Sequence, residues 1–175
     1  MSDITVRRLG EDEWEQYKTA RLSALEESPE AFAASLEEER AYDEEFWRTR
    51  LRRSPRLLAE ADGQTVGIVS VGQSQEDNDR VAEIFGLWVA PAARGTGVAT
   101  RLVHAGADEA RSAGRSHLAY WVGSDNGRAV AFASGCGFRP TDSRRPMRVQ
   151  QAGEDQEDEV AMVLPLGADR GTPSL

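Results

Sequence analysis

The stretch "VAPAARGTGVATRLV" joins an apolar, strand-like segment to a segment with helical periodicity, and this join constrains the fold more than any other feature. Pro91, Gly95 and Gly97 crowd the join, and Arg94 stands among them. Glycine lets the backbone turn tightly and lets a ligand approach it closely. The first turn of a helix has N–H groups without intrahelical partners and carries the positive end of the helix dipole. The stretch therefore predicts a backbone cradle for a phosphate or pyrophosphate.

Two other phosphate-binding motifs are excluded. The chain has no G-x-x-x-x-G-K-[ST] loop, and it has no G-x-G-x-x-G sequence placed after a first strand with an acidic residue suitably downstream. A plain strand-to-helix turn that happens to use two glycines is the structural alternative to the cradle.

Strand-like and helix-like segments alternate along the chain and predict an α/β fold. We expect a mixed, mainly antiparallel, twisted sheet of about six to seven strands flanked by about four helices. One parallel strand–helix–strand unit is expected from Val81 to Val122. Asp62-Gly63, between two apolar runs, predicts a hairpin turn. Residues 1–166 are expected to form a single domain, and residues 167–175 a flexible tail. The segments behind this prediction are strands at 4–9, 56–73 (two), 81–90, 116–124, 139–151 and 158–166, and helices at 11–28, 43–53, 98–114 and 125–138, with 30–40 helix-permissive but less regular.

Composition narrows the class of protein. The 175-residue chain has a formal net charge of -9, which makes it a poor general binder of nucleic acid. The sequence contains no run of eighteen apolar residues, so no membrane span is predicted. The first residues lack the apolar region of a secretory signal. The single cysteine, Cys136, cannot form an internal disulfide, which is consistent with a cytoplasmic location.

The cradle resembles the acyl-CoA-binding motif of the GNAT N-acetyltransferase superfamily, Arg/Gln-x-x-Gly-x-Gly/Ala, which reads here "RGTGVA" from Arg94 to Ala99. About thirty residues later the chain resembles a second motif of that family, Asn-x-x-Ala-x-x-Phe-Tyr-x-x-x-Gly-Phe. The residues at its matching positions are Asn126, Ala129, Phe132, Gly137 and Phe138. The resemblance covers 81–138 closely and the rest of the chain loosely. It implies direct transfer of an acetyl group from acetyl-CoA, as co-substrate, to a primary amine.

The resemblance also implies roles for individual residues. The backbone of Leu87, Trp88 and Val89 would pair with the pantetheine arm. The pyrophosphate would lie on the cradle, and the other side of the coenzyme on the second motif. Glu83, on the strand before the cradle, would be the general base; its alternative is a place at the start of the strand, exposed or paired with an arginine. The implied cofactor-binding residues are Leu87, Trp88, Val89, Arg94, Gly95, Thr96, Gly97, Val98, Ala99, Thr100, Asn126, Ala129 and Phe132.

One position departs from the family. The tyrosine often proposed as the general acid toward the leaving thiolate is Ala133 here, and alanine cannot donate a proton. Ser134 is adjacent but is expected on another face of its helix, so Tyr120, Ser124 or a water molecule are the other candidates.

The remaining reactive side chains are interpreted as structural. Cys136 stands between two glycines at a helix end, so a small core or turn role is expected rather than a nucleophile. His104 and His117 form no cluster with metal-ligand spacing, so no metal is expected. Trp88 and Trp121 are interpreted either as walls of the cofactor channel or as core.

Acidic side chains gather at 26–45 and 154–159. They form either solvated surface or the border of a site for a cationic amine, such as a polyamine or an aminoglycoside-like molecule. The alternatives to this small-molecule acceptor are acetylation of a protein amine and a non-catalytic acyl-CoA sensor. The late strand "DEVAMVLPL" is apolar enough for a homodimer interface or for the core.

Overall fold

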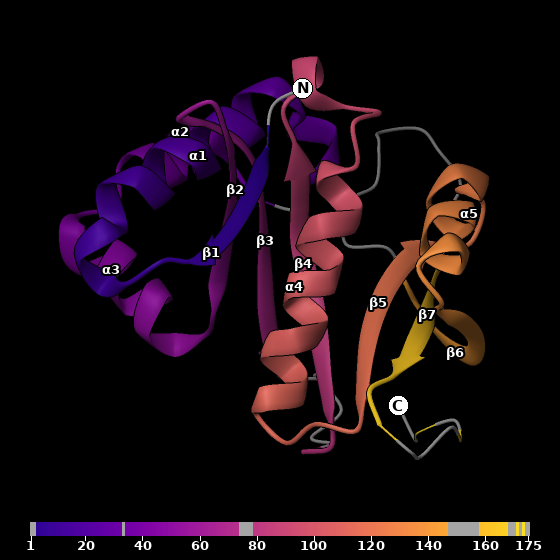
Figure 1. Cartoon of the computed structure of the whole chain (residues 1–175). Helices are drawn as coiled ribbons and strands as arrows, with labels where there is room; N and C mark the ends of the chain where they lie inside the picture. Colours follow the sequence, from indigo (N-terminus) through magenta and orange to yellow (C-terminus); the bar gives the residue numbers. More distant parts are fainter. Residues whose placement is uncertain are drawn as a thin grey trace. The chain divides into compact units, whose positions relative to one another are not determined.

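The structure of the chain is a computed structural model that describes residues 3–32, 34–73, 79–146, 158–167, 171 and 173. The expected tail at 167–175 and the late acidic segment at 154–157 lie largely or wholly outside these residues. The helices and strands, which can be followed in chain order in Figure 1, are β1 (Ile4–Arg8), α1 (Trp14–Glu27), α2 (Leu36–Arg40), α3 (Glu44–Arg53), β2 (Arg56–Ala61), β3 (Gln64–Gln73), β4 (Val81–Val89), α4 (Val98–Ser112), β5 (His117–Gly123), α5 (Gly127–Gly135), β6 (Arg139–Pro146) and β7 (Asp158–Pro165).

Seven strands form a mixed sheet in the order β1-β2-β3-β4-β5-β7-β6. The pairs β1/β2, β2/β3, β5/β7 and β6/β7 are antiparallel, and β4/β5 is parallel. The predicted fold class and its parallel unit are therefore confirmed. The described residues contain five α-helices rather than about four, because the segment at 29–40 breaks into a 3-10 turn at Pro29–Ala31 and the short α2, which Ser35 caps.

The chain divides into two compact units, Met1–Val71 with Gly86–Gly106, and Gly72–Phe85 with Ala107–Leu175. The first unit contains β1, α1, α2, α3, β2, most of β3, the end of β4 and the start of α4. The second contains the start of β4, the end of α4, β5, α5, β6 and β7. Each unit has a buried apolar cluster of its own.

In the first unit, α1 uses small residues to approach its neighbours. Ala20 and Ala24 are buried on α1, and Tyr17 lies edge-to-face against Trp47 of α3, with ring centroids 5.8 Å apart. The β2–β3 turn is the predicted hairpin. Asp62 and Gly63 have φ angles of 53° and 76°, and two successive positive values are typical of a type I′ turn.

In the second unit, β4 and β5 align in parallel, with Val81 beside His117 and Ile84 beside Tyr120. The helix that connects them, α4, ends at Ser112, and Gly114 follows it with a φ of 81°. Gly114 N–H donates to the Arg111 carbonyl and Arg115 N–H to the Ala110 carbonyl, so the last turn is closed by a Schellman arrangement.

Gly67 of β3 is a point of close approach in the first unit. A Cβ atom there would lie 2.9 Å from the Trp88 carbonyl oxygen and within 3.0 Å of the Leu102 and Val98 side chains. We expect Gly67→Ala to lower the free energy of unfolding by about 1–3 kcal/mol, because the Trp88 backbone cannot move aside cheaply. Gly127→Ala is the control, since nothing lies within 4 Å of its Cβ position. Urea unfolding of both variants measures the difference; an equal effect at both positions would contradict the packing argument.

Candidate acetyl-CoA and acetyl-transfer site

The predicted cradle lies in the first unit, where β4 passes into α4. After β4 comes a 3-10 turn at Pro91–Ala93, then the exposed residues 94–97, and α4 begins at Val98. Gly95 and Gly97 have φ angles of 81° and 92°, and nothing lies within 4 Å of the Cβ position of either. Both glycines therefore hold a backbone shape that other residues adopt only with strain, and their open side faces no protein atom. Together with the free N–H groups of a 15-residue helix, this arrangement fits a pyrophosphate.

The Arg94 side chain folds back onto the end of β4. Its Nη2 donates to Glu27 Oε2 at 2.8 Å, and its Nε donates to the Val89 carbonyl at 3.1 Å. The Trp88 indole N–H donates to the same Glu27 oxygen at 2.8 Å. Hydrogen bonds from Ser28, Trp88 and Arg94 lower the pKa of Glu27, so this carboxylate is a stable anion beside the cradle. Arg94 thus has a protein partner, and its pairing with a phosphate stays a prediction.

The strand that would carry the pantetheine arm loses its regular geometry at Gly86. This residue has a φ of 65°, and the residues after Ile84 are less buried than those before it. Trp88 is buried in the apolar cluster of the first unit, whereas Leu87 and Val89 are half-buried. Trp88 is therefore a core residue, and a role as channel wall stays a prediction.

Glu83 lies in the second unit and is only 5% exposed. It stands beside Ala119 in the β4–β5 register, and its Oε1 is 3.8 Å from Arg145 Nη1. Of the sequence alternatives, an exposed position is wrong, whereas pairing with an arginine is confirmed. The guanidinium offsets part of the free-energy cost of burying this carboxylate.

Arg145 of β6 reaches across the sheet of the second unit. Its Nε donates to Glu159 of β7 at 2.7 Å, and its guanidinium stacks over the Trp121 ring of β5 at 4.2 Å. Sequence reasoning missed this residue. Only the structure identifies it, because the strand sequence RPTDSRRP shows no apolar alternation, whereas in the structure Arg145 falls on the half-buried side of β6.

The second motif forms α5. The Asn126 side chain caps this helix and accepts from the Ala129 N–H at 3.1 Å, which explains an asparagine there on structural grounds alone. Asn126 is exposed, while Ala129 and Phe132 are half-buried. Ala133 is fully buried, whereas Ser134 and Ser124 are exposed.

Tyr120 is one of the general-acid candidates named from the sequence, and that role stays a prediction. Its ring lies edge-to-face against Phe138, with centroids 6.2 Å apart. Burial, and then the charges of Cys136 and Glu159, raise the pKa of the Tyr120 phenol above its ordinary value of 10.0. The phenol is therefore protonated at neutral pH, as a general acid requires.

The structure places the remaining reactive side chains as follows. His117 is buried, with Nδ1 2.9 Å from Ser116 Oγ and Nε2 2.7 Å from the Gly171 carbonyl, and His104 is exposed. Cys136 is the C-cap of α5. Within the described ranges, no group of three or more His, Cys, Asp or Glu side chains is arranged to hold a metal ion. The described helices include none long and apolar enough to cross a membrane.

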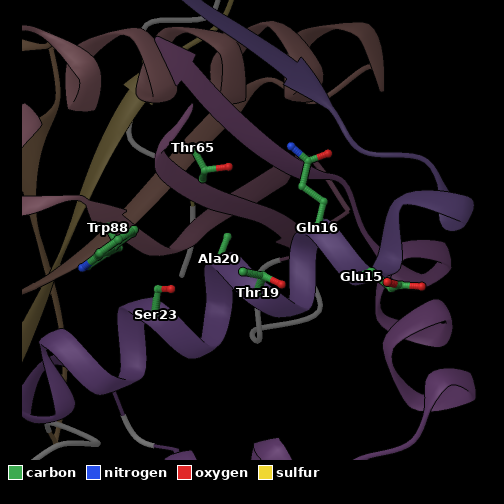
Figure 2. Close-up of a pocket in the computed structure, with 7 residues that line it drawn as sticks. All are labelled: Glu15, Gln16, Thr19, Ala20, Ser23, Thr65 and Trp88. Carbon is green, nitrogen blue, oxygen red and sulfur yellow. The ribbon is translucent and has the colours of Figure 1, made fainter. Parts of the chain in front are cut away.

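A cavity of about 310 Å³ opens in the first unit between α1 and the β3–β4 strands (Figure 2). Its walls carry hydroxyl, amide and carboxylate groups beside the Trp88 ring. Of the sequence-predicted site residues, Trp88 lines it. The lining residues are Glu15, Gln16, Thr19, Ala20, Ser23, Thr65 and Trp88.

Comparisons with known proteins agree with the resemblance seen in the motifs. A mycothiol acetyltransferase of Sanguibacter keddieii is 37% identical over 100 residues, which is 55% of this chain and 30% of that protein. An uncharacterised N-acetyltransferase of Methanocaldococcus jannaschii is 33% identical over 85 residues, 47% of this chain and 38% of that protein. The matches thus span about a third of the length of these curated relatives.

Solved structures show the same fold over nearly their whole length. The acetyltransferase yncA of Salmonella typhimurium, solved with its cofactor acetyl-CoA, has a TM-score of 0.72 at 21% identity and covers 98% of this chain and 99% of its own. A ribosomal-protein-alanine N-acetyltransferase of Brucella melitensis has a TM-score of 0.70 at 24% identity, with 92% and 99% covered. A sequence profile of the acetyltransferase (GNAT) family matches residues 12–138, which include both the cradle and α5. The chain therefore belongs to the acetyltransferase (GNAT) family.

Proposed function

We propose that this chain transfers the acetyl group of acetyl-CoA directly to a primary amine of a small molecule. The observation that carries the proposal is the cradle, in which Gly95 and Gly97 present open backbone of positive φ at the start of α4. Membership in the GNAT family and the acetyl-CoA bound to yncA support the choice of co-substrate. The cradle binds the pyrophosphate, and β4 from Leu87 to Val89 pairs with the pantetheine arm.

The chemistry requires a base and an acid. Bound acetyl-CoA supplies an acetyl group activated as a thioester. The neutral amine nitrogen forms a C–N bond to the acetyl carbon as the C–S bond breaks. Glu83 takes the proton that the amine loses, directly or through one water molecule, because alkylamines are mostly protonated at neutral pH. Tyr120 gives its proton to the departing thiolate and takes the place of the tyrosine absent at Ala133.

Several acidic side chains already form ion pairs within the protein, and this leaves fewer carboxylates to bind a cationic acceptor. Of the early acidic residues, Glu27, Glu39, Glu44 and Glu45 pair with arginines, and Asp43 caps α3. Of the late ones, Glu159 pairs with Arg145. These carboxylates are occupied within the protein, so the polyamine or aminoglycoside-like acceptor stays a prediction that rests on the remaining acidic side chains.

Thiol release from acetyl-CoA tests the proposal. The purified chain is assayed against diamines, aminoglycosides, amino acids and short peptides with free N-termini. We expect acceptor-dependent release of free thiol and an acetylated amine of matching mass. Release only with peptides would move the function to protein amines, the acceptor in the name of the Brucella relative. Binding of acetyl-CoA without release in any arm would favour the sensor.

The cradle makes a second prediction. We expect Gly97→Ala to raise the Kd of acetyl-CoA at least about tenfold, because a Cβ atom strains this φ and occupies the side on which the pyrophosphate would lie. Gly114→Ala is the matched control, since Gly114 has a similar positive φ at the other end of α4 and an equally open Cβ position. Calorimetric titration with acetyl-CoA measures both. Equal Kd values for the two variants would show that strain alone, not the cradle, determines the effect.

A further inference from the structure

Arg21 of α1 is held by a buried carboxylate in the first unit. Its Nε and Nη2 donate to the two oxygens of Glu39, each at 3.1 Å, and Glu39 is 1% exposed. The Phe32 ring covers the guanidinium, with the Cζ atom 4.9 Å from the ring centroid. Two parallel hydrogen bonds and one stacked ring fix the plane of the guanidinium, so its remaining nitrogen points in a set direction.

Glu39 carries a second guanidinium. Arg50 Nη1 donates to Glu39 Oε1 at 2.8 Å, while its Cζ lies 4.8 Å from the Phe46 ring centroid and 5.1 Å from that of Trp47. In this described cluster one carboxylate faces two arginines. Arg56, whose Nη1 donates to Ser70 Oγ, is a third arginine close to Arg21 and Arg50. The arginines named here outnumber the carboxylate, and an anionic ligand can balance part of their charge.

The remaining nitrogen, Arg21 Nη1, lies beside Gly86 of β4. It lies 3.7 Å from the Cβ position of Gly86, and Ser70 Oγ of β3 lies 3.7 Å from the same point. The structure gives Nη1 no hydrogen bond within the described residues. The Arg21 side chain is 15% exposed and Gly86 is half-buried, so neither residue is fully buried.

Ser70 contributes a second donor. Its Oγ accepts a hydrogen bond from Arg56 Nη1 at 2.7 Å, which leaves the hydroxyl hydrogen of Ser70 to be donated elsewhere. Ser70 is itself 6% exposed. A fixed guanidinium N–H and a buried hydroxyl thus flank one position where glycine leaves out a side chain. We call this position, bounded by Arg21, Ser70 and Gly86, the Gly86 niche.

We propose that the Gly86 niche binds a carboxylate of the acceptor, so that the acceptor is an amino acid-like molecule with both a primary amine and a carboxylate. The inference rests on the proposed acetyltransferase function and names its substrate class. Two hydrogen-bond donors, one of them on a guanidinium, match the two acceptor oxygens and the negative charge of a carboxylate.

Matched acceptors test the proposal on the wild-type chain. L-α-amino acids and ω-amino acids such as 4-aminobutyrate are compared with their amides and with the corresponding amines that lack the carboxylate. We expect kcat/KM to favour the acids over their amides by at least about tenfold, mainly through KM, because a charge-assisted pair is lost in the amide. Equal kcat/KM values for acids and amides overturn the proposal.

Two arginine variants distinguish a role of Arg21 in binding the acceptor carboxylate from its role in the ion pairs of Glu39. Arg21→Lys retains a cation for Glu39 but removes Nη1 from the niche, and we expect the acid-to-amide ratio to fall to near one while the KM for acetyl-CoA is unchanged. Arg50→Lys alters the other partner of Glu39 without touching the niche, and we expect it to keep the ratio. Ser70→Ala should lower the ratio part of the way. A ratio changed equally by Arg21→Lys and Arg50→Lys overturns the proposal, because it would assign the effect to the Glu39 cluster alone.

A binding measurement keeps the inference separate from the proposed function. Absence of thiol release with every amine would count against the acetyltransferase. Calorimetric titration of the CoA-loaded chain with the same acids and amides still reports on the niche. We expect acids to bind more tightly than amides in the wild type and equally in Arg21→Lys. No difference in the wild type overturns the niche whether or not turnover is found.

Discussion

Glu83→Gln is expected to lower kcat/KM at neutral pH by about 10²–10⁴-fold, the usual contribution of a positioned general base. Glutamine keeps the size of the buried side chain and one acceptor oxygen for Arg145, but it cannot accept the amine proton. The Kd of acetyl-CoA should be unchanged, because the cradle does not include this side chain. Steady-state thiol release and calorimetric titration of the same preparations measure the two effects.

The pH dependence of the variant separates catalysis from packing. Without a base, the reaction depends on amine that is already neutral, so the activity of Glu83→Gln should rise with pH toward the amine pKa. Glu159→Gln is the control, since Glu159 is the other carboxylate that Arg145 contacts. We expect it to keep most of the activity. Glu83→Gln with more than about a tenth of wild-type activity would show that Glu83 is only the structural partner of Arg145.

Glu39→Gln is expected to destabilise the chain by about 3–5 kcal/mol, because it removes the one carboxylate that two partly buried arginines share. Glu44→Gln is the matched control. Glu44 also pairs with an arginine, Arg48, at 3.6 Å, but it is 57% exposed, and exposed pairs contribute about 0–1 kcal/mol. Urea unfolding monitored by tryptophan fluorescence compares the two. Similar losses would show that burial of Glu39 does not set its contribution.

Glu39 also predicts a pH dependence of stability. Burial acts to raise the pKa of Glu39, but hydrogen bonds from Arg21 and Arg50 outweigh it and hold the pKa below its ordinary value of 4.5. A depressed pKa in the folded state contributes stability that is fully present above about 4.5 and is lost as the pH falls further. We therefore expect the gap in unfolding free energy between wild type and Glu39→Gln to be constant at neutral pH and to narrow in acid. A gap that widens in acid would contradict this sign.

In the structure, several acidic residues of the early cluster form ion pairs with arginines of the same chain. The sequence left the early cluster as either solvated surface or the border of a site for a cationic amine. In the structure, Glu39 is buried and binds two arginines, and Glu27 binds Arg94. The proposed acceptor site uses Arg21 Nη1, which lies beside Gly86. An acceptor with a carboxylate fits this charge, and the amine panel with its matched acids and amides distinguishes it from a simple polyamine.

Local sequence was sufficient where one residue type decides the backbone. Gly95 and Gly97 adopt positive φ, and Asp62-Gly63 forms the hairpin turn. Each of these depends on a residue and its nearest neighbours, and glycine is favoured there on steric grounds. Apolar periodicity likewise predicted the strands and the long helices, because one face of each must be buried. The break at 29–40 was missed, since a short capped helix gives too few residues to show a period.

Tertiary structure alone decided which charged groups meet. Arg94 pairs with Glu27, 67 positions earlier, and Arg145 reaches Glu83 from a strand that is not its neighbour in the sheet. Arg21 finds Glu39 only because α1 and α2 pack together. The partners of long side chains depend on strand order, register and helix packing. Periodicity in a single sequence does not encode these three properties. The sequence by itself therefore determined the helices and strands, the cradle and the family resemblance. The tertiary structure determined that Glu83 is buried beside Arg145 and that Arg21 Nη1 lies beside Gly86.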